Sequence, residues 1–193
     1  MNITLKLKSM EIRISTKQVL QLLLLLSWIV FIGLCIQSGG FIFNTFFTLV
    51  INPIGAHNYW ENADLSGLYA HDPGYFLVET VLMIIVSIMK ALLFYLIVKI
   101  LHDKKLNMAQ PFNAAMGRFL FNSAYLALGI GLFSSWGSNY AAWFVSQGVK
   151  MPDIQQLHLG GADVWLFMSI ILLVIAQIFK RGIEIQSENE LTI

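Results

Sequence analysis

Four long apolar stretches constrain the fold of this 193-residue chain more strongly than any short motif in it. They cover residues 19–38, 76–101, 119–136 and 164–179. A helix rises about 1.5 Å per residue, so roughly 20 apolar residues cross a hydrocarbon core about 30 Å thick. A helix also pairs its own backbone polar groups, which find no water in lipid. We therefore predict an all-α, polytopic membrane protein built on a four-transmembrane-helix bundle.

The composition supports this class and the absence of a separate soluble domain. Hydrophobic residues make up 57% of the chain and charged residues 12%, against about 25% charged in a typical soluble domain. We expect one membrane domain over residues 1–193, with no cofactor. The single cysteine, Cys35, lies in the first stretch and excludes an intrachain disulfide. Whether translation starts at Met1 or Met10 is left open.

The basic residues lie mostly on one predicted side of the membrane. Ten of the twelve are in the segments before the first stretch, around the middle connection and after the last stretch: Lys6, Lys8, Arg13, Lys17, Lys99, Lys104, Lys105, Arg118, Lys180 and Arg181. Lysine and arginine are enriched in cytoplasmic segments. We expect both termini and the 180–193 tail in the cytoplasm, and connections 39–75 and 137–163 outside as an extended extracytoplasmic cap.

The first of these connections opens with a second, shorter apolar run. Gly39 and Gly40 separate residues 41–51 from the first stretch, so we expect a break, followed by either a kinked extension or an interfacial segment. Tyr59 and Trp60 follow, and Trp143 lies near the end of the third stretch. We interpret these aromatic residues as a belt at the headgroup level, with an aromatic ligand pocket as the alternative.

Three histidines fall in the predicted cap, where they are weak candidates for metal ligands: His57, His71 and His158. Imidazoles with neighbouring carboxylates can bind zinc or another divalent ion. The chain has no H-x-x-x-H or C-x-x-C spacing, and the ligands would have to come from two connections. We therefore predict no metal site and interpret the three as polar loop residues.

Polar residues within the apolar stretches are stronger candidates for function. Glu79 and Lys90 lie in the second stretch and Asn122 in the third. Ionisable groups at membrane depth are costly and usually face protein or water. Glu79 and Lys90 are eleven residues apart, about 16 Å along a helix, which is too far for a pair. We expect Lys90 to meet Asn122, Ser123 or Gln177, or to reach the cytoplasmic headgroups along its flexible stem.

The third stretch also carries a ridge of small residues at every fourth position: Ser123, Ala127, Gly131 and Ser135. Such ridges let helix backbones approach closely in lipid. The ridge predicts tight helix packing and leaves a homo-oligomer open.

Short motifs in the first stretch and in the predicted cytoplasmic segments give the chain a resemblance to a known family. They are the Ser27-Trp28 step, the Pro111-Phe112 element before the third stretch and the ending F-K-R-G-I-E-I-Q-S-E-N-E-L-T-I. With the four stretches, these resemble the bacterial membrane family called domain of unknown function 2975. The resemblance implies pairing with a small helix-turn-helix regulator of the Xre type and supplies no catalytic residues.

These observations favour a regulatory or sensory protein of the bacterial inner (plasma) membrane, which tethers or modulates that regulator. Candidate contacts are Pro111, Phe112, Lys180, Arg181, Gly182, Glu184, Glu188, Glu190 and Leu191. The alternative is a small transporter or channel subunit that uses Lys90 and Glu79. No H-E-x-x-H or G-x-S-x-G motif is present, so we do not expect an enzyme. Direct nucleic-acid binding is not expected either.

Overall fold

The computed structural model describes residues 15–61, 63–103 and 112–190, and its regular structure is helical. The long helices are α1 (Thr16–Phe46), α3 (Pro73–His102), α4 (Ala114–Ser146) and α5 (Ala162–Glu190). The π-helical turn η1 (Phe47–Ile51) extends α1, and the short η2 (Pro53–Ala56) and α2 (Ser66–His71) follow it. Over the described ranges, four helical segments are long and apolar enough to span a membrane. The predicted all-α, four-helix membrane fold is confirmed.

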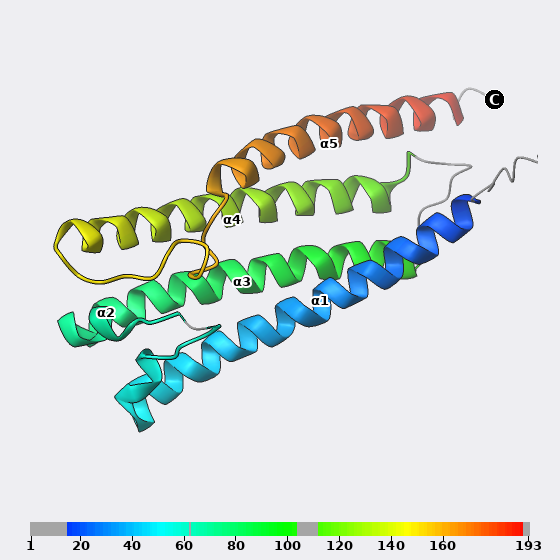
Figure 1. Cartoon of the computed structure of the whole chain (residues 1–193). Coiled ribbons are helices and arrows are strands. Elements are labelled where there is room, and N and C mark those ends of the chain that lie inside the picture. Colours follow the sequence, from blue (N-terminus) through cyan, green and yellow to red (C-terminus); the bar gives the residue numbers. More distant parts are fainter. Residues whose placement is uncertain (1–14, 62, 104–111, 191–193) are drawn as a thin grey trace, which may run out of the picture.

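The long helices pack in the order α1, α3, α4, α5, and α3 and α4 therefore form the centre (Figure 1). Small residues of α4 bring α5 close, since a Cβ added at Gly131 would lie 2.7 Å from Leu166 Cγ. This order puts wide apolar surfaces of α1 and α5 outside, as expected for helices in contact with lipid.

The helix starts follow from the polar residues that precede them. The Ser15 hydroxyl accepts a hydrogen bond from Gln18 N, and Gln18 Oε1 accepts one from Ser15 N, which completes a capping box at α1. Asp72 Oδ1 accepts from Gly74 N at the start of α3, next to Pro73. Asn113 Oδ1 accepts from Met116 N at the start of α4. Each cap satisfies amide groups that the first helical turn leaves unpaired.

The first span is longer than predicted, and the expected break at Gly39–Gly40 is wrong. Helix α1 runs through both glycines and, with η1, forms a 36-residue apolar segment. A glycine is needed at position 40 for packing, because a Cβ added there would overlap the ring of Trp60. Gly40 thus serves close packing against an aromatic ring and leaves the helix intact.

The boundaries at the other spans also differ from the prediction. Helix α4 continues to Ser146, so the first part of the predicted 137–163 connection is helical. Helix α5 continues from the apolar stretch through the predicted tail as far as Glu190. Hydropathy marks only the most apolar portion of a helix. Helix α4 continues past the polar residues Ser138 and Asn139 into residues 140–146, and α5 continues into the charged tail.

The two connections at one end of the helices form a folded layer, which we call the cap (residues 52–61, 63–72 and 147–161). Its buried residues Tyr59, Leu65, Leu68, Leu157 and Leu159 join one core with apolar residues of the long helices. Tyr59 is 0% exposed, so its interpretation as a belt residue is wrong. We call the opposite end, where α1 and α4 start and α3 and α5 end, the basic end (Figure 1).

Candidate functional site

The cap is joined to the membrane helices by a hydrogen bond from a lysine within α3. Lys90 Nζ donates to the His158 carbonyl oxygen at 3.0 Å. The same Nζ lies 6.0 Å from the centre of the ring of Trp165, the fourth residue of α5. The loop 147–161 folds back along α4 to make this contact, because α5 starts partway along α4 (Figure 1). Lys90 therefore links α3, the loop and the start of α5.

This partner differs from those predicted for Lys90, and so does its direction. Asn122, Ser123 and Gln177 do not bond it, and its ammonium group points toward the cap rather than the basic end. The Cα–Cβ bonds of a helix tilt toward its N-terminus, and the N-terminus of α3 lies in the cap. The side chain extends in that direction and meets a backbone carbonyl.

His158 takes a backbone conformation that suits this contact. Its φ is 56°, in the left-handed region that His adopts more readily than most residues. Its ring lies 5.6 Å from the Phe41 ring, and Nε2 is 3.6 Å from Glu61 Oε2. Burial lowers the pKa of His158; the Glu61 carboxylate opposes this shift and the Lys90 charge adds to it. The neutral imidazole is therefore favoured here.

The other two histidines lie in different surroundings. His57 Nδ1 is 3.9 Å from Asp64 Oδ2, and the His71 ring stacks on Tyr75 at 5.9 Å. In the part of the chain that the structure describes, no three His, Cys, Asp or Glu side chains gather as metal ligands. The structure thus distributes the three histidines over separate contacts.

Asp64 organises the outer face of the cap. The Ser66 hydroxyl and amide both donate to Asp64 Oδ1, and Lys150 Nζ is 3.8 Å from Oδ2. The Ser66 hydroxyl is the main cause of a lowered pKa at Asp64, which burial opposes and the nearby His57 and Lys150 support. Asp64 thereby connects the two halves of the cap.

Tyr59 fixes the cap to α1. Its hydroxyl donates to the Phe41 carbonyl oxygen at 2.9 Å and lies 2.7 Å from Thr45 Oγ1. Asn44 Nδ2 donates to the Tyr59 carbonyl oxygen. This role was not predicted from the sequence, although Asn44 and Thr45 stand out as polar residues within the apolar run 41–51.

Glu79 is fully buried near the cap end of α3. Neither carboxylate oxygen has a hydrogen-bond partner among the described residues. As predicted from the spacing, it does not pair with Lys90, which bonds the loop instead. An unpaired ionisable group at such a position is costly in folding energy, so Glu79 is a candidate for function.

The predicted ridge of α4 is mostly buried. Ser123 and Ala127 are buried, Gly131 touches Leu166 of α5, and Ser135 is half-buried. Gly117 and Gly137 extend the close approach, against Ile183 and Leu159 respectively. The fourth-residue pattern did not include these two glycines. Asn122 is exposed on α4 and faces a groove between α3 and α4.

The predicted partner-binding residues lie at the basic end. The Phe112 ring packs at a tilt against Phe179, with ring centres 5.1 Å apart, and covers Gly182. Arg181 Nη1 and Glu184 Oε2 form an ion pair at 3.1 Å, and Lys180 and Glu188 are exposed. Pro111, Leu191 and the side chain of Glu190 lie outside the described residues.

Comparison with known proteins assigns the chain to a family. Residues 60–193 match the family described as "Protein of unknown function (DUF2975)". No curated protein and no solved structure matches the chain. The match covers the cap from Trp60 onward and α2 to α5. Since it spans more than half of the sequence, this chain belongs to the DUF2975 family.

Proposed function

We propose that this protein is a sensory regulator of the bacterial inner (plasma) membrane, in which the cap responds to an external condition and α5 transmits the response to a cytoplasmic helix-turn-helix regulator. One observation carries this proposal: α5 is a single helix from the cap loop to Glu190 at the basic end. A rigid helix can convey a displacement at one end to the other. We also propose that the protein has no enzymatic activity of its own.

The orientation rests on charge. Lys17, Lys99, Arg118, Lys180 and Arg181 all lie at the basic end, whereas Lys150 lies in the cap. The positive-inside rule then puts the basic end, with both termini, in the cytoplasm. The cap is extracytoplasmic in this arrangement.

The connection from cap to α5 is short and well anchored. The His158 carbonyl is held by Lys90, and the Leu159 carbonyl accepts from Ser138 Oγ at 3.2 Å. Gly161, with φ at 76°, then turns the chain into α5. A shift of the cap loop is therefore passed directly to the first turn of α5.

The other end of α5 offers a surface to a partner. Gly182 and Ile183 pack against Phe112 and Gly117, which docks the first turn of the tail on α4. Ile185, further along, is 46% exposed. The family resemblance implies that this partner is an Xre-type regulator.

A pull-down of the detergent-solubilised full chain from its native host tests the proposal. Two truncations are compared, one lacking residues 182–193 and one lacking only 185–193. The shorter deletion keeps the Gly182 and Ile183 packing. The control carries residues 185–193 in scrambled order. We expect the full chain to capture a helix-turn-helix regulator and all three variants to lose it.

Capture of no such regulator by the full chain would overturn the proposal. Equal capture by the variant lacking 182–193 would exclude the tail as the contact. If only the variant lacking 182–193 lost the regulator, the contact would lie in the turn that contains Gly182 and Ile183.

Burial of Glu79 favours a second candidate function, that of a small transporter or channel subunit. An unpaired carboxylate inside a membrane protein is typical of ion or proton pathways. Ion flux into liposomes that contain the purified protein tests this candidate. Glu79→Gln should abolish the flux while the protein remains folded, and Lys90→Leu tests the second charge. Absence of flux with the wild-type protein would exclude the candidate.

A further inference from the structure

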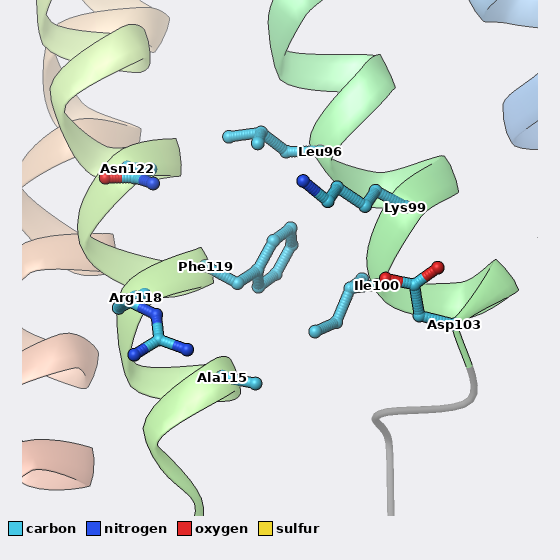
Figure 2. Close-up of a pocket in the computed structure, with 8 residues that line it drawn as sticks. All are labelled: Leu96, Lys99, Ile100, Asp103, Ala115, Arg118, Phe119 and Asn122. Atoms are coloured by element: carbon cyan, nitrogen blue, oxygen red, sulfur yellow. The ribbon is translucent and has the colours of Figure 1, made fainter.

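The basic end of the α3–α4 interface contains a pocket, and an apolar groove lies next to it. The pocket, about 180 Å³ in volume, is drawn in Figure 2. Its lining residues are Leu96, Lys99, Ile100, Asp103, Ala115, Arg118, Phe119 and Asn122. Leu96 and Asn122 also line a groove of about 550 Å³. The pocket and the groove are therefore adjacent, with Leu96 and Asn122 shared between their walls.

The groove is apolar along the depth of the bilayer. Besides Leu96 and Asn122, its lining consists of Met89, Leu92, Tyr95, Tyr125 and Leu126. From Leu96 to Met89 the helix rises about 10 Å, which matches the upper part of an acyl chain. Leu92 is exposed, and Tyr125 is 59% exposed. The groove is therefore exposed at Leu92 and Tyr125, while Tyr95 at its edge contacts Phe31 of α1 at 6.0 Å.

The pocket is cationic at the level where headgroups lie. Lys99 comes from α3 and Arg118 from α4, and Figure 2 shows the Lys99 ammonium directed toward α4. Neither side chain forms an ion pair with another residue in the described ranges. Asp103 places one carboxylate at the same pocket, which leaves an excess of positive charge. Asn122 adds an amide between the cations and the groove.

We propose that this pocket and groove bind an anionic phospholipid, whose phosphate lies between Lys99 and Arg118 and whose acyl chain occupies the groove. Basic pockets between membrane helices are suited to acidic headgroups, and the guanidinium of arginine matches phosphate geometry. A cationic pocket next to an apolar groove fits an amphiphile with an anionic headgroup. The proposal is independent of the regulatory function.

Native mass spectrometry of the full chain in detergent tests the proposal, with phosphatidylglycerol and phosphatidylcholine of identical acyl chains as probes. The test variant is K99Q/R118Q. The control K17Q/K180Q removes the same charge from the same end, away from the pocket. We expect phosphatidylglycerol affinity to fall roughly 5-fold for each cation removed. The control should keep wild-type affinity, and phosphatidylcholine binding should not change.

A second variant tests the groove without altering charge. Leu92→Trp fills the groove from an exposed position, so the fold should tolerate it. We expect it to weaken phosphatidylglycerol binding although Lys99 and Arg118 are retained. Soluble glycerol phosphate should bind far more weakly than the lipid, since it lacks the acyl chain.

Three results would overturn the proposal. Equal loss of phosphatidylglycerol in K99Q/R118Q and K17Q/K180Q would indicate diffuse charge attraction. If glycerol phosphate bound as tightly as phosphatidylglycerol, the groove would make no contribution to binding. A dimer that Leu92→Trp converts to a monomer would place a second copy of the chain in the groove.

Discussion

The two ends of the helices are held together in different ways. At the cap end, α1, α3 and α4 meet a layer of buried side chains fixed by Tyr59, Lys90 and Asp64. At the basic end, α3 and α4 enclose an open pocket. In the most apolar portion of the first span, only 6% of the residues are buried within the protein. Specific polar contacts fix the cap, whereas the pocket between α3 and α4 stays open at the basic end.

The close approach of α4 and α5 joins these two ends, and a larger side chain there should have the largest effect. In Gly131→Leu, the added atoms meet Leu166 Cγ at 2.7 Å and the Leu166 backbone nitrogen at 3.0 Å. A backbone atom cannot rotate away, so we expect the free energy of unfolding to fall by about 3 kcal/mol. Unfolding in detergent with increasing SDS measures this change.

Gly33→Leu is the matched control, because a Cβ at Gly33 meets no atom within 4 Å. It should leave the unfolding midpoint unchanged or raise it, since glycine is a poor helix former. A similar loss in both variants would contradict the tight α4–α5 packing.

Removing one hydroxyl at the cap end should have the next largest effect. Tyr59→Phe deletes the hydrogen bonds to the Phe41 carbonyl and to Thr45 in a fully buried place. We expect a loss of about 2 kcal/mol in the free energy of unfolding. The same measurement applies, with Tyr125→Phe as control because Tyr125 is exposed on α4. Equal stability of Tyr59→Phe and wild type would contradict the anchoring role.

Lys90→Met should act locally rather than globally. It removes the hydrogen bond to the His158 carbonyl but also the cost of desolvating an ammonium group, so overall stability should change little. The loop should open more often, with exchange of the His158 and Leu159 amides about 10-fold faster. Hydrogen exchange followed by mass spectrometry measures it. Lys99→Met, at the basic end, should leave these amides unchanged, and unchanged exchange in Lys90→Met would contradict the link.

The sequence predicted the features of this fold that hydropathy controls. Four apolar stretches of nearly bilayer length lead directly to four helices, since lipid leaves the backbone few alternatives. Helix ends were less accurate, because α4 continues past the polar residues Ser138 and Asn139 and α5 continues into the charged tail. A local drop in hydropathy does not by itself end a helix. The family resemblance was also recognisable from short motifs, and the match over residues 60–193 confirms it.

Lys90 and Gly40 show why the candidate site was harder to predict. Lys90 was identified as unusual, but its partner is a backbone carbonyl 68 residues away, and a carbonyl has no residue-specific mark in a sequence. Gly40 was interpreted as part of a break, whereas its role is close packing against Trp60, which lies 20 residues further along the chain. Long-range pairing of this kind depends on the fold of the cap, which one sequence does not encode in local patterns.

The smallest expected effect is a dependence of cap stability on pH through His158. Its pKa is lowered in the folded protein, mainly by burial, relative to an ordinary value of about 6.5. Between the two pKa values the unfolded chain binds more protons, so stability rises with pH and is lost on acidification. We expect a loss below about 1 kcal/mol between pH 7.5 and 5. The midpoint of thermal unfolding at both pH values measures it.

The variant His158→Asn keeps a residue type that accepts the left-handed backbone and removes the titrating group. Its stability should depend less on pH than that of the wild type over this range. His57→Asn is the control, because His57 is 75% exposed in its side chain and pairs loosely with Asp64. If His57→Asn rather than His158→Asn removed the acid sensitivity, the surface of the cap would be its pH-responsive part. The contact between cap and membrane helices would then be insensitive to acid, and the contrast between a fixed cap end and an open basic end would hold at low pH as well.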